Sequence, residues 1–144
     1  MPNNINALTF DNHDTYIYYS TDWFKNEQTL NLIPTNPEDK DIVRYSSDEV
    51  DLFTNGVKNG LLKINTFLRL NQNITTITTI STMITNDGIL MFNFAGEINS
   101  SFLAITGTQT KTLATYKSGK YANYINVQIQ TDIEDGYRKI TISY

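Results

Sequence analysis

The sequence predicts an all-β domain, either a sandwich or a barrel. Three observations lead to this prediction. Apolar and polar residues alternate with a period of two along most of the chain, β-branched and aromatic residues fill these stretches, and turn signals separate them about every dozen residues. A chain of 144 residues has the length of one domain, so we expect a single barrel domain over residues 1–144.

Eight stretches have a clear strand pattern, because their side chains alternate between the two faces that a pleated strand presents. In chain order they are Thr15–Ser20, Gln28–Ile33, Val50–Phe53, Leu61–Leu70, Ile89–Phe94, Phe102–Gly107, Asn123–Thr131 and Arg138–Tyr144. No helix is required, and if one exists we expect it at Thr21–Gln28 or Ser46–Phe53.

The stretch Asn73–Thr85, NITTITTISTMIT, is less regular, because its apolar residues recur every three positions. A helix would roughly tolerate that spacing, but a run of β-branched residues loses side-chain freedom in a helix. We therefore predict another strand, with Ile and Thr on both faces. Such a strand suits a barrel wall packed on both sides or a strand at a subunit interface.

Turns are predicted where Asn, Asp and Gly meet, since these residues adopt the positive φ values of tight hairpins. They are Asn55–Gly60, Asn86–Gly88 and Glu134–Gly136. Pro34–Asp41 is rich in proline and acids and is predicted to be a polar loop.

Composition excludes several classes of protein. The chain has no cysteine, which rules out disulfides, cysteine-based zinc sites and cysteine nucleophiles. Its net charge of −4 and scattered basic residues argue against nucleic-acid partners and a polybasic membrane contact. We find no signal peptide and no apolar run that could span a membrane, so we expect a cytoplasmic or virion location. We expect no cofactor and no metal.

Candidate catalytic groups are sparse. The one histidine, His13, lies between carboxylates and could serve as a general base, but an exposed turn before a strand is the favoured interpretation. The acid-rich segments NPEDKD and SSDEVD lack the spacing of a calcium loop and are interpreted as solvated loops. Glu97 and Glu134 lie nearest to strand ends and are the acids that a glycoside hydrolase would use.

The stretch TYKSGKYANYINVQI, residues 115–129, contains the candidate ligand-binding residues. Its single glycine leads into a strand, so a phosphate-binding loop is excluded. In the strand pattern Tyr121 and Asn123 share the core-facing side with Ile125, and Arg138 faces the same side at the start of the last strand. We therefore predict Tyr121, Asn123 and Arg138 at one barrel end, where they either border a ligand cavity or plug it.

The segments DGILMFNFAGEINSSFLAITG and SGKYANYINVQIQ resemble the barrel domain of the allene oxide cyclase and dirigent protein superfamily, over roughly residues 48–144. The likeness rests on a small-Gly step (Ala95-Gly96), the FLAITG strand and a Gly-x-Tyr turn. It implies an antiparallel eight-stranded barrel, calycin-like and often trimeric, whose lumen can hold a small apolar ligand. A β-sandwich of the jelly-roll type is the alternative fold. The chain departs from the family by a longer link after FLAITG, and no catalytic residues of the family can be placed on it.

Two functions remain. The first is a non-enzymatic barrel, a structural or interaction module that self-assembles, with a trimer favoured, and that we expect to be viral or virion-associated. The alternative is a lumen-binding protein or a cyclase-like isomerase for a small apolar ligand. A sugar-binding module is third, because the nine tyrosines and one tryptophan are more often core or interface residues in β proteins.

Overall fold

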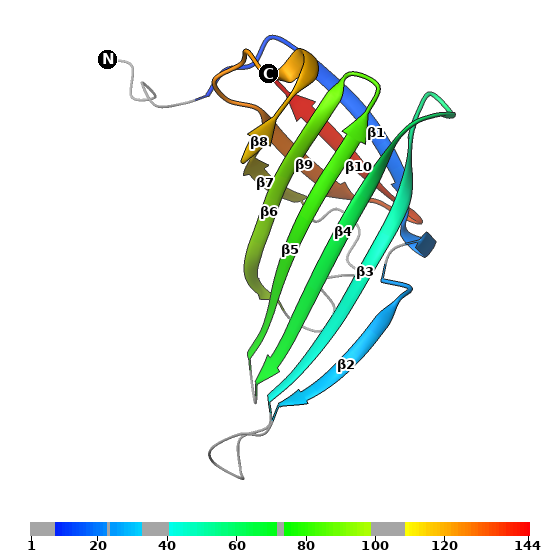
Figure 1. Cartoon of the computed structure of the whole chain (residues 1–144), viewed down its shortest axis with the longest axis vertical. Coiled ribbons are helices and arrows are strands. Elements are labelled where there is room, and N and C mark those ends of the chain that lie inside the picture. Colours follow the sequence, from blue (N-terminus) through cyan, green and yellow to red (C-terminus); the bar gives the residue numbers. More distant parts are fainter. Residues whose placement is uncertain (1–7, 23, 33–40, 72–73, 99–108) are drawn as a thin grey trace.

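A computed structural model of the chain describes residues 8–22, 24–32, 41–71, 74–98 and 109–144. These residues form ten β-strands and two short 3-10 helices (Figure 1). The strands are β1 (His13–Tyr19), β2 (Glu27–Leu32), β3 (Asp41–Thr54), β4 (Val57–Asn71), β5 (Ile74–Thr85), β6 (Gly88–Ile98), β7 (Gln109–Leu113), β8 (Tyr116–Lys117), β9 (Gln128–Ile133) and β10 (Tyr137–Ser143). The helices are η1 (Ser20–Asp22) and η3 (Gly119–Tyr121).

All ladders between these strands are antiparallel, and they make one sheet in the order β7-β9-β10-β1-β3-β4-β5-β6-β8. Strand β2 lies off this path and pairs with β3. The sheet curls strongly, so that the long strands β3 to β6 form one wall and β9, β10 and β1 form the wall that faces it (Figure 1). The predicted all-β, antiparallel, barrel-like fold is therefore confirmed at this level.

The two ends of the curled sheet meet where β7 passes into β8. The amide of Ala114 donates to the carbonyl of Val127, just before β9, at 2.8 Å. The next amide, Thr115, donates to the carbonyl of Met91 on β6, also at 2.8 Å. Two successive amides thus join both edges of the sheet, and the Thr112 hydroxyl adds a bond to the Asn93 carbonyl at 3.0 Å.

The predicted hairpins form where Asn, Asp and Gly were expected to make turns. Asn55 and Gly56, between β3 and β4, have φ values of 50° and 76°, the pair of positive values that a two-residue hairpin turn needs. Thr85 pairs with Gly88 across the β5–β6 turn. The amide of Glu134 donates to the carbonyl of Tyr137 at 3.0 Å and closes the β9–β10 turn.

Alternation along the strands places the core on the concave face of the sheet. Even-numbered residues point inward over 46–52 of β3, 60–68 of β4, 90–96 of β6 and 138–142 of β10, as do odd-numbered residues over 77–83 of β5, because each antiparallel register keeps partners on one face. A register shift at Leu52/Phe53 turns Lys58 to the outer face, where it pairs with Asp51. The buried cluster comprises Tyr16, Tyr18, Val50, Leu52, Leu62, Ile64, Met83, Leu90, Phe92, Tyr121, Val127, Ile129, Ile140 and Ile142.

The strand predicted from the Ile/Thr-rich stretch is confirmed as β5. Ile77 and Met83 are buried on its concave side, whereas Ile80 is 42% exposed on the convex side. The apolar residues recur every three positions, whereas side chains of a strand change face at every position. Successive isoleucines therefore fall on alternate faces of β5.

Other expectations need correction. The strand predicted to begin at Asn123 begins at Gln128, and Ile125, expected in the core, is 91% exposed. Residues 124–127 lie in an irregular segment, so their apolar alternation does not report a strand. The helix suggested at Ser46–Phe53 is part of β3.

The strand predicted at Phe102–Gly107 and most of the Pro34–Asp41 loop lie outside the described residues. Within the described part of the chain, no helix is long and apolar enough to cross a membrane.

Candidate functional site

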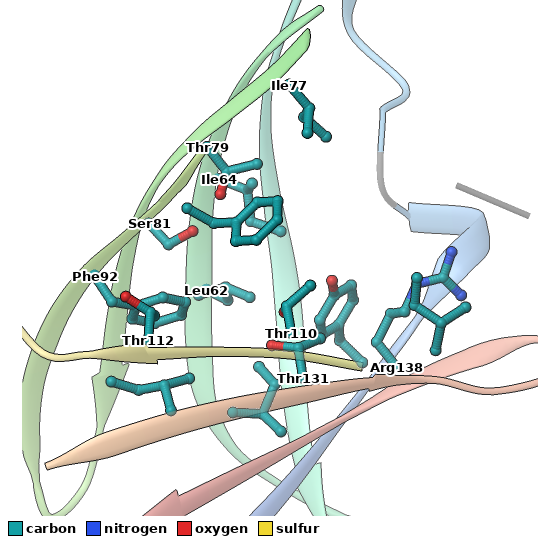
Figure 2. A pocket seen from close by; sticks show the side chains of 15 residues that line it. Leu62, Ile64, Ile77, Thr79, Ser81, Phe92, Thr110, Thr112, Thr131 and Arg138 are labelled. Atoms are coloured by element: carbon teal, nitrogen blue, oxygen red, sulfur yellow. The ribbon is translucent and has the colours of Figure 1, made fainter. Parts of the chain in front are cut away.

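The concave face holds an interior cavity of about 100 Å³, partly open to solvent, between β4, β5 and β6 on one wall and β9 and β10 on the other (Figure 2). Its lining residues are Tyr18, Leu62, Ile64, Ile77, Thr79, Ser81, Phe92, Phe94, Thr110, Thr112, Ile129, Thr131, Ile133, Arg138 and Ile140. The cavity continues the hydrophobic core toward the end of the barrel where β9 turns into β10.

Five serine and threonine side chains distinguish this cavity from an ordinary gap in a core. Thr79 and Ser81 occupy inward positions of β5, between the buried residues Ile77 and Met83. Thr110, Thr112 and Thr131 come from β7 and β9 and approach from the other wall (Figure 2). Hydroxyl groups can both donate and accept hydrogen bonds, so the cavity offers polar contacts within an apolar surround.

Tyr18 and Arg138 complete the polar lining. They are direct partners in the β1–β10 ladder, so both side chains point to the concave face. Arg138 is 8% exposed, and its guanidinium Nη1 donates to the carbonyl of Tyr137 at 3.3 Å. Burial raises the pKa of Tyr18 to about 12, although the positive charge of Arg138 acts in the opposite direction. Tyr18 is therefore a neutral hydrogen-bond donor at physiological pH.

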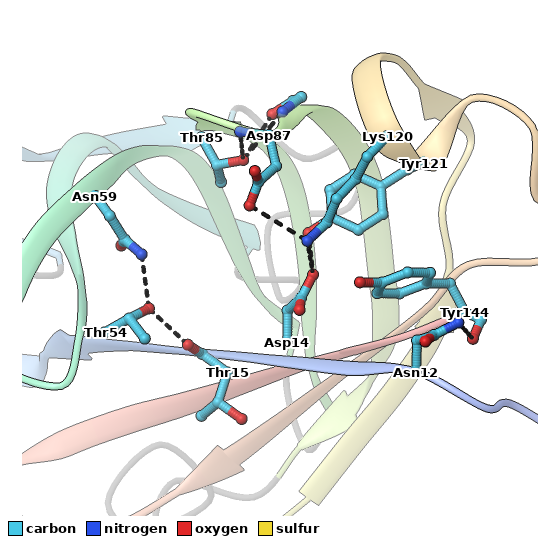
Figure 3. A network of polar contacts seen from close by, with 11 residues as sticks. Asn12, Asp14, Thr15, Thr54, Asn59, Thr85, Asp87, Lys120, Tyr121 and Tyr144 are labelled. Atoms are coloured by element: carbon cyan, nitrogen blue, oxygen red, sulfur yellow. Dashed lines mark hydrogen bonds and ion pairs between the residues drawn. The ribbon is translucent and has the colours of Figure 1, made fainter.

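A second polar group, here called the end cluster, closes the opposite end of the barrel and consists of Asp14, Asp87, Lys120, Tyr121 and Tyr144 (Figure 3). The Tyr121 hydroxyl donates to Asp14 Oδ2 at 2.8 Å. Lys120 Nζ lies 2.7 Å from Asp14 Oδ2 and 3.3 Å from Asp87 Oδ2. The ring of Tyr144 stacks edge-on against Tyr121, with ring centroids 5.1 Å apart.

Two glycines bring the segments of the end cluster together. A Cβ on Gly119 would lie 2.1 Å from the carbonyl oxygen of Asp87, and one on Gly88 would lie 2.2 Å from that of Ser118. Only residues without a side chain allow the β5–β6 turn and η3 to approach so closely. The amide of Lys120 donates to the Asp87 carbonyl at 2.9 Å and fixes this contact.

The contacts within the end cluster favour a charged Asp14, a charged Lys120 and a neutral Tyr121. Partial burial acts against the charged form of Asp14, but hydrogen bonds from Lys120, Tyr121 and Tyr144 outweigh it and lower the pKa of this carboxyl. Burial disfavours the Lys120 ammonium, yet Asp14, Tyr144 and Asp87 together raise its pKa. Burial and the hydrogen bond to Asp14 raise the pKa of Tyr121. Tyr121 therefore remains protonated, and it is fully buried, so it plugs the barrel end.

The three residues predicted to share a site are separated by the structure. Arg138 lines the interior cavity, Tyr121 belongs to the end cluster, and Asn123 lines a groove on the outside of the same barrel end. Arg138 begins β10, whereas Tyr144, which packs on Tyr121, follows the end of that strand. Six residues of strand span about 20 Å, so Arg138 and Tyr121 lie at opposite ends of the barrel.

The cavity hydroxyls were missed from the sequence. Their signal was present in β5, where Thr79 and Ser81 take positions that the alternation assigns to the core. Threonine is common in strands for its shape alone, so its presence on an inward face did not indicate a site.

The remaining chemical candidates do not assemble into a catalytic site. His13 is exposed, and its Nδ1 lies 2.8 Å from Ser143 Oγ because the two residues are partners in the β1–β10 ladder. Glu97 and Glu134 line neither the cavity nor the groove. Among the described residues no group of three His, Cys, Asp or Glu side chains could hold a metal ion.

The interpretation of SSDEVD as a solvated loop is wrong, because these residues lie within β3 and Asp48 is 3% exposed. Its carboxylate accepts hydrogen bonds from the amides of Phe24 and Lys25 at 2.9 Å each, and from the Ser46 hydroxyl at 2.7 Å. Asp48 thus anchors the segment between η1 and β2, which is a structural role.

No protein-family model matches this chain. No curated protein is significantly similar to it in sequence.

Proposed function

We propose that the protein is a non-enzymatic binding barrel whose interior cavity holds a small, largely apolar molecule with one polar group. The observation that supports this proposal is the cavity itself, in which hydroxyls and one guanidinium line an otherwise apolar space. Ligand sites commonly combine a mostly apolar surface with a few polar groups that fix orientation. The sequence favoured a structural module over ligand binding, and the lining of the cavity supports the latter.

The volume of the cavity limits its occupant. A dry apolar cavity of about 150 Å³ is known to accept benzene, so a space of about 100 Å³ suits at most a single small ring or one end of a longer molecule. Arg138 supplies positive charge at one side, and the hydroxyls of Thr79 and Ser81 supply donors and acceptors at the other. A phenol-like or carboxylate-bearing ring combines these requirements.

The residues that line the cavity favour binding over catalysis. They include no Asp, Glu, His or Lys, so they offer no side chain that exchanges a proton near neutral pH. Tyr18, with a pKa of about 12, holds its proton throughout that range. A cyclase-like isomerase remains the weaker version of this proposal, because it would need another group to move a proton.

The likeness to the allene oxide cyclase and dirigent barrel is also a proposal. It gains support from the chain between β7 and β8, where adjacent amides bond to the residue just before β9 and to β6. If β7 and β8 count as one wall strand, the nine strands on the main path occupy eight positions around the barrel.

The interior cavity is tested by paired threonine variants and a set of small probes. We expect phenol and benzoate to shift the NMR signals of cavity residues in the wild-type protein. Thr79→Val removes one hydroxyl while preserving shape, and it should weaken phenol binding by roughly fivefold, the value of one net hydrogen bond. Thr78→Val alters the neighbouring residue on the opposite, exposed face and should leave binding unchanged.

Filling the cavity provides a second arm of this test. Ile77→Trp should abolish the binding of both probes, since the added volume occupies the space that they need. Equal binding to the Trp variant and to wild type would place the probes elsewhere and contradict the proposal. The absence of any cavity shift in wild-type protein at saturating probe concentrations would do the same.

A self-associating structural module is the second candidate, and one observation favours it. On the convex face, two neighbouring rows across β3 to β6 carry no charged side chain. They are Tyr45, Phe67, Thr78 and Ala95, and Ser47, Asn65, Ile80 and Asn93. An exposed surface of this kind is common at protein–protein contacts, and the expected trimer would use it.

A further inference from the structure

We propose a second binding site, in a groove on the outside of the plugged barrel end, that takes a neutral polyhydroxylated ligand such as a saccharide unit. This end groove has a volume of about 360 Å³, within the range of small-molecule sites. Its lining residues are Leu8, Thr9, Phe10, Asp11, Asn12, Asn123, Tyr124, Ile125, Asn126 and Tyr144. The inference is independent of the interior cavity, from which the end cluster separates it.

The base of the end groove is fixed by main-chain bonds. The amide of Asn12 donates to the carbonyl of Tyr144 at 2.9 Å, and the amide of Tyr144 donates back to Asn12 at 3.0 Å. The Asn12 side-chain amide adds a bond to the same Tyr144 carbonyl at 3.3 Å (Figure 3). These bonds extend the β1–β10 ladder by one pair, so the floor of the groove is as ordered as the sheet beneath it.

The opposite wall, residues 122–127, is also held in place although it is not a strand. Lys117 Nζ donates to the carbonyls of Tyr124 and Ile125, the latter at 3.0 Å. The amide of Tyr124 donates to the carbonyl of Tyr121 at 3.2 Å, which ties the wall to the plug. A groove whose two walls are fixed before binding loses little conformational entropy when a ligand enters.

The chemistry of the lining suits a sugar. Asn12, Asn123 and Asn126 present amide groups, each of which can donate and accept, and hydroxyls of a saccharide do both as well. Asp11 adds a carboxylate that accepts from hydroxyls. Tyr124 and Tyr144 lie edge to face, with centroids 4.9 Å apart and planes at 73°, so they give the groove aromatic surface for the apolar face of a sugar ring.

Charge argues against the other ligand classes. The lining includes one carboxylate and no Lys or Arg, so a phosphate or a nucleic acid would meet net negative charge. An apolar ligand would leave the three asparagine amides without partners from the ligand. A protein partner docking on Leu8 and Ile125 is the competing interpretation, since both are exposed.

The test uses the full chain and a panel of neutral monosaccharides and short oligosaccharides, with binding followed by NMR and calorimetry. We expect at least one saccharide to shift the side-chain amide signals of Asn123 and Asn126. Tyr124→Ala should weaken that binding about tenfold, because it removes one of the two rings. Tyr19→Ala is the matched control, since Tyr19 is a similarly exposed tyrosine with a ring contact at the other end of β1.

Three outcomes would overturn the proposal. The first is that no saccharide shifts the groove amides, and the second is that Tyr124→Ala and Tyr19→Ala weaken binding equally. The third is that a peptide or protein occupies the groove where the sugars do not. Thr79→Val, which changes the interior cavity, should leave saccharide binding unaffected, so the two sites are judged separately.

Discussion

Asp14 connects three segments of the chain that lie far apart in sequence. Its carboxylate receives the Tyr121 hydroxyl and the Lys120 ammonium, and Lys120 also reaches Asp87 on the β5–β6 turn. Because Asp14 is more than two-thirds buried, its contacts are less screened by solvent than those of a surface pair. We therefore expect this one side chain to link the stability of the barrel end to pH.

The pKa of Asp14 is lowered in the folded protein relative to 3.8, so the folded state favours its charged form. The stabilisation is complete above the unfolded pKa and is lost as pH falls through the lower, folded value. We expect Asp14→Asn to be less stable than wild type at neutral pH. The difference in melting temperature should shrink below about pH 3.8, as thermal melts between about pH 2 and pH 7 would show. A difference that stays constant over this range would contradict the linkage.

At the scale of elements, the position of η3 against the β5–β6 turn depends on two glycines. Gly119 has a φ of 64° and its missing Cβ faces the Asp87 carbonyl, whereas Gly56, in the β3–β4 turn, has a φ of 76° and open space around it. The two positions therefore have similar positive φ values and differ in the space available for an added methyl group, so substitutions at them can be compared directly.

We expect Gly56→Ala to cost about 1–2 kcal/mol in the free energy of unfolding, the cost of a left-handed conformation for alanine. Gly119→Ala should cost about 1–3 kcal/mol more, because the new methyl group forces η3 away from the turn. Urea denaturation of the two variants measures the difference. Equal losses would show that the approach of η3 to the turn contributes nothing to stability.

The strands and hairpins could be predicted because they depend on neighbouring residues. Alternation identified β1, β4, β6 and β10, and Asn-Gly and Asp-Gly steps identified the turns between long strands. Alternation failed at Ile125, where the pattern continues from β9 into an irregular segment held by Lys117. The hydrogen bonds from Lys117 to two carbonyls of this segment cannot be predicted from the alternation of apolar and polar residues.

The candidate sites were less predictable, because they depend on long-range registers. The inward direction of Arg138 followed from the pattern of β10. Its separation from Tyr121 did not, because Arg138 lies near the start of β10 and Tyr121 packs on Tyr144, beyond the end of that strand. The contact between Asp14 and Tyr121 joins residues 107 positions apart and has no local signature. The buried carboxylate of Asp48 looked like a loop residue for the same reason, since its partners come from another element.

At the scale of the whole molecule, the convex face of the long strands is the surface proposed for contact with a second copy. Ile80 is 42% exposed at its centre, beside Phe67 and Met91 on the adjacent strands, which are also exposed. Leu113, on β7 at one edge of the sheet, has the same exposure. Ile80 on the convex face and Leu113 at the sheet edge are therefore equally exposed apolar residues, and substituting each of them compares the two surfaces.

If the protein self-associates through this face, light scattering should give about three times the chain mass of 16.4 kDa for the expected trimer. Ile80→Lys should then reduce the measured mass to that of one chain, because a buried unpaired charge at an interface is costly. Leu113→Lys should leave the assembly intact. A wild-type protein that remains a monomer at high concentration would exclude this second candidate function.

The junction at Ala114 and Thr115 has a consequence for how the proposed ligand would reach the interior. Within the described residues, β6 and β7 approach each other without sharing a ladder, so the barrel has a seam on that side. The seam borders the cavity, since Phe92, Phe94, Thr110 and Thr112 belong to both. Along its described length a guest would break the side-chain bond from Thr112 to Asn93, while every strand ladder stays intact.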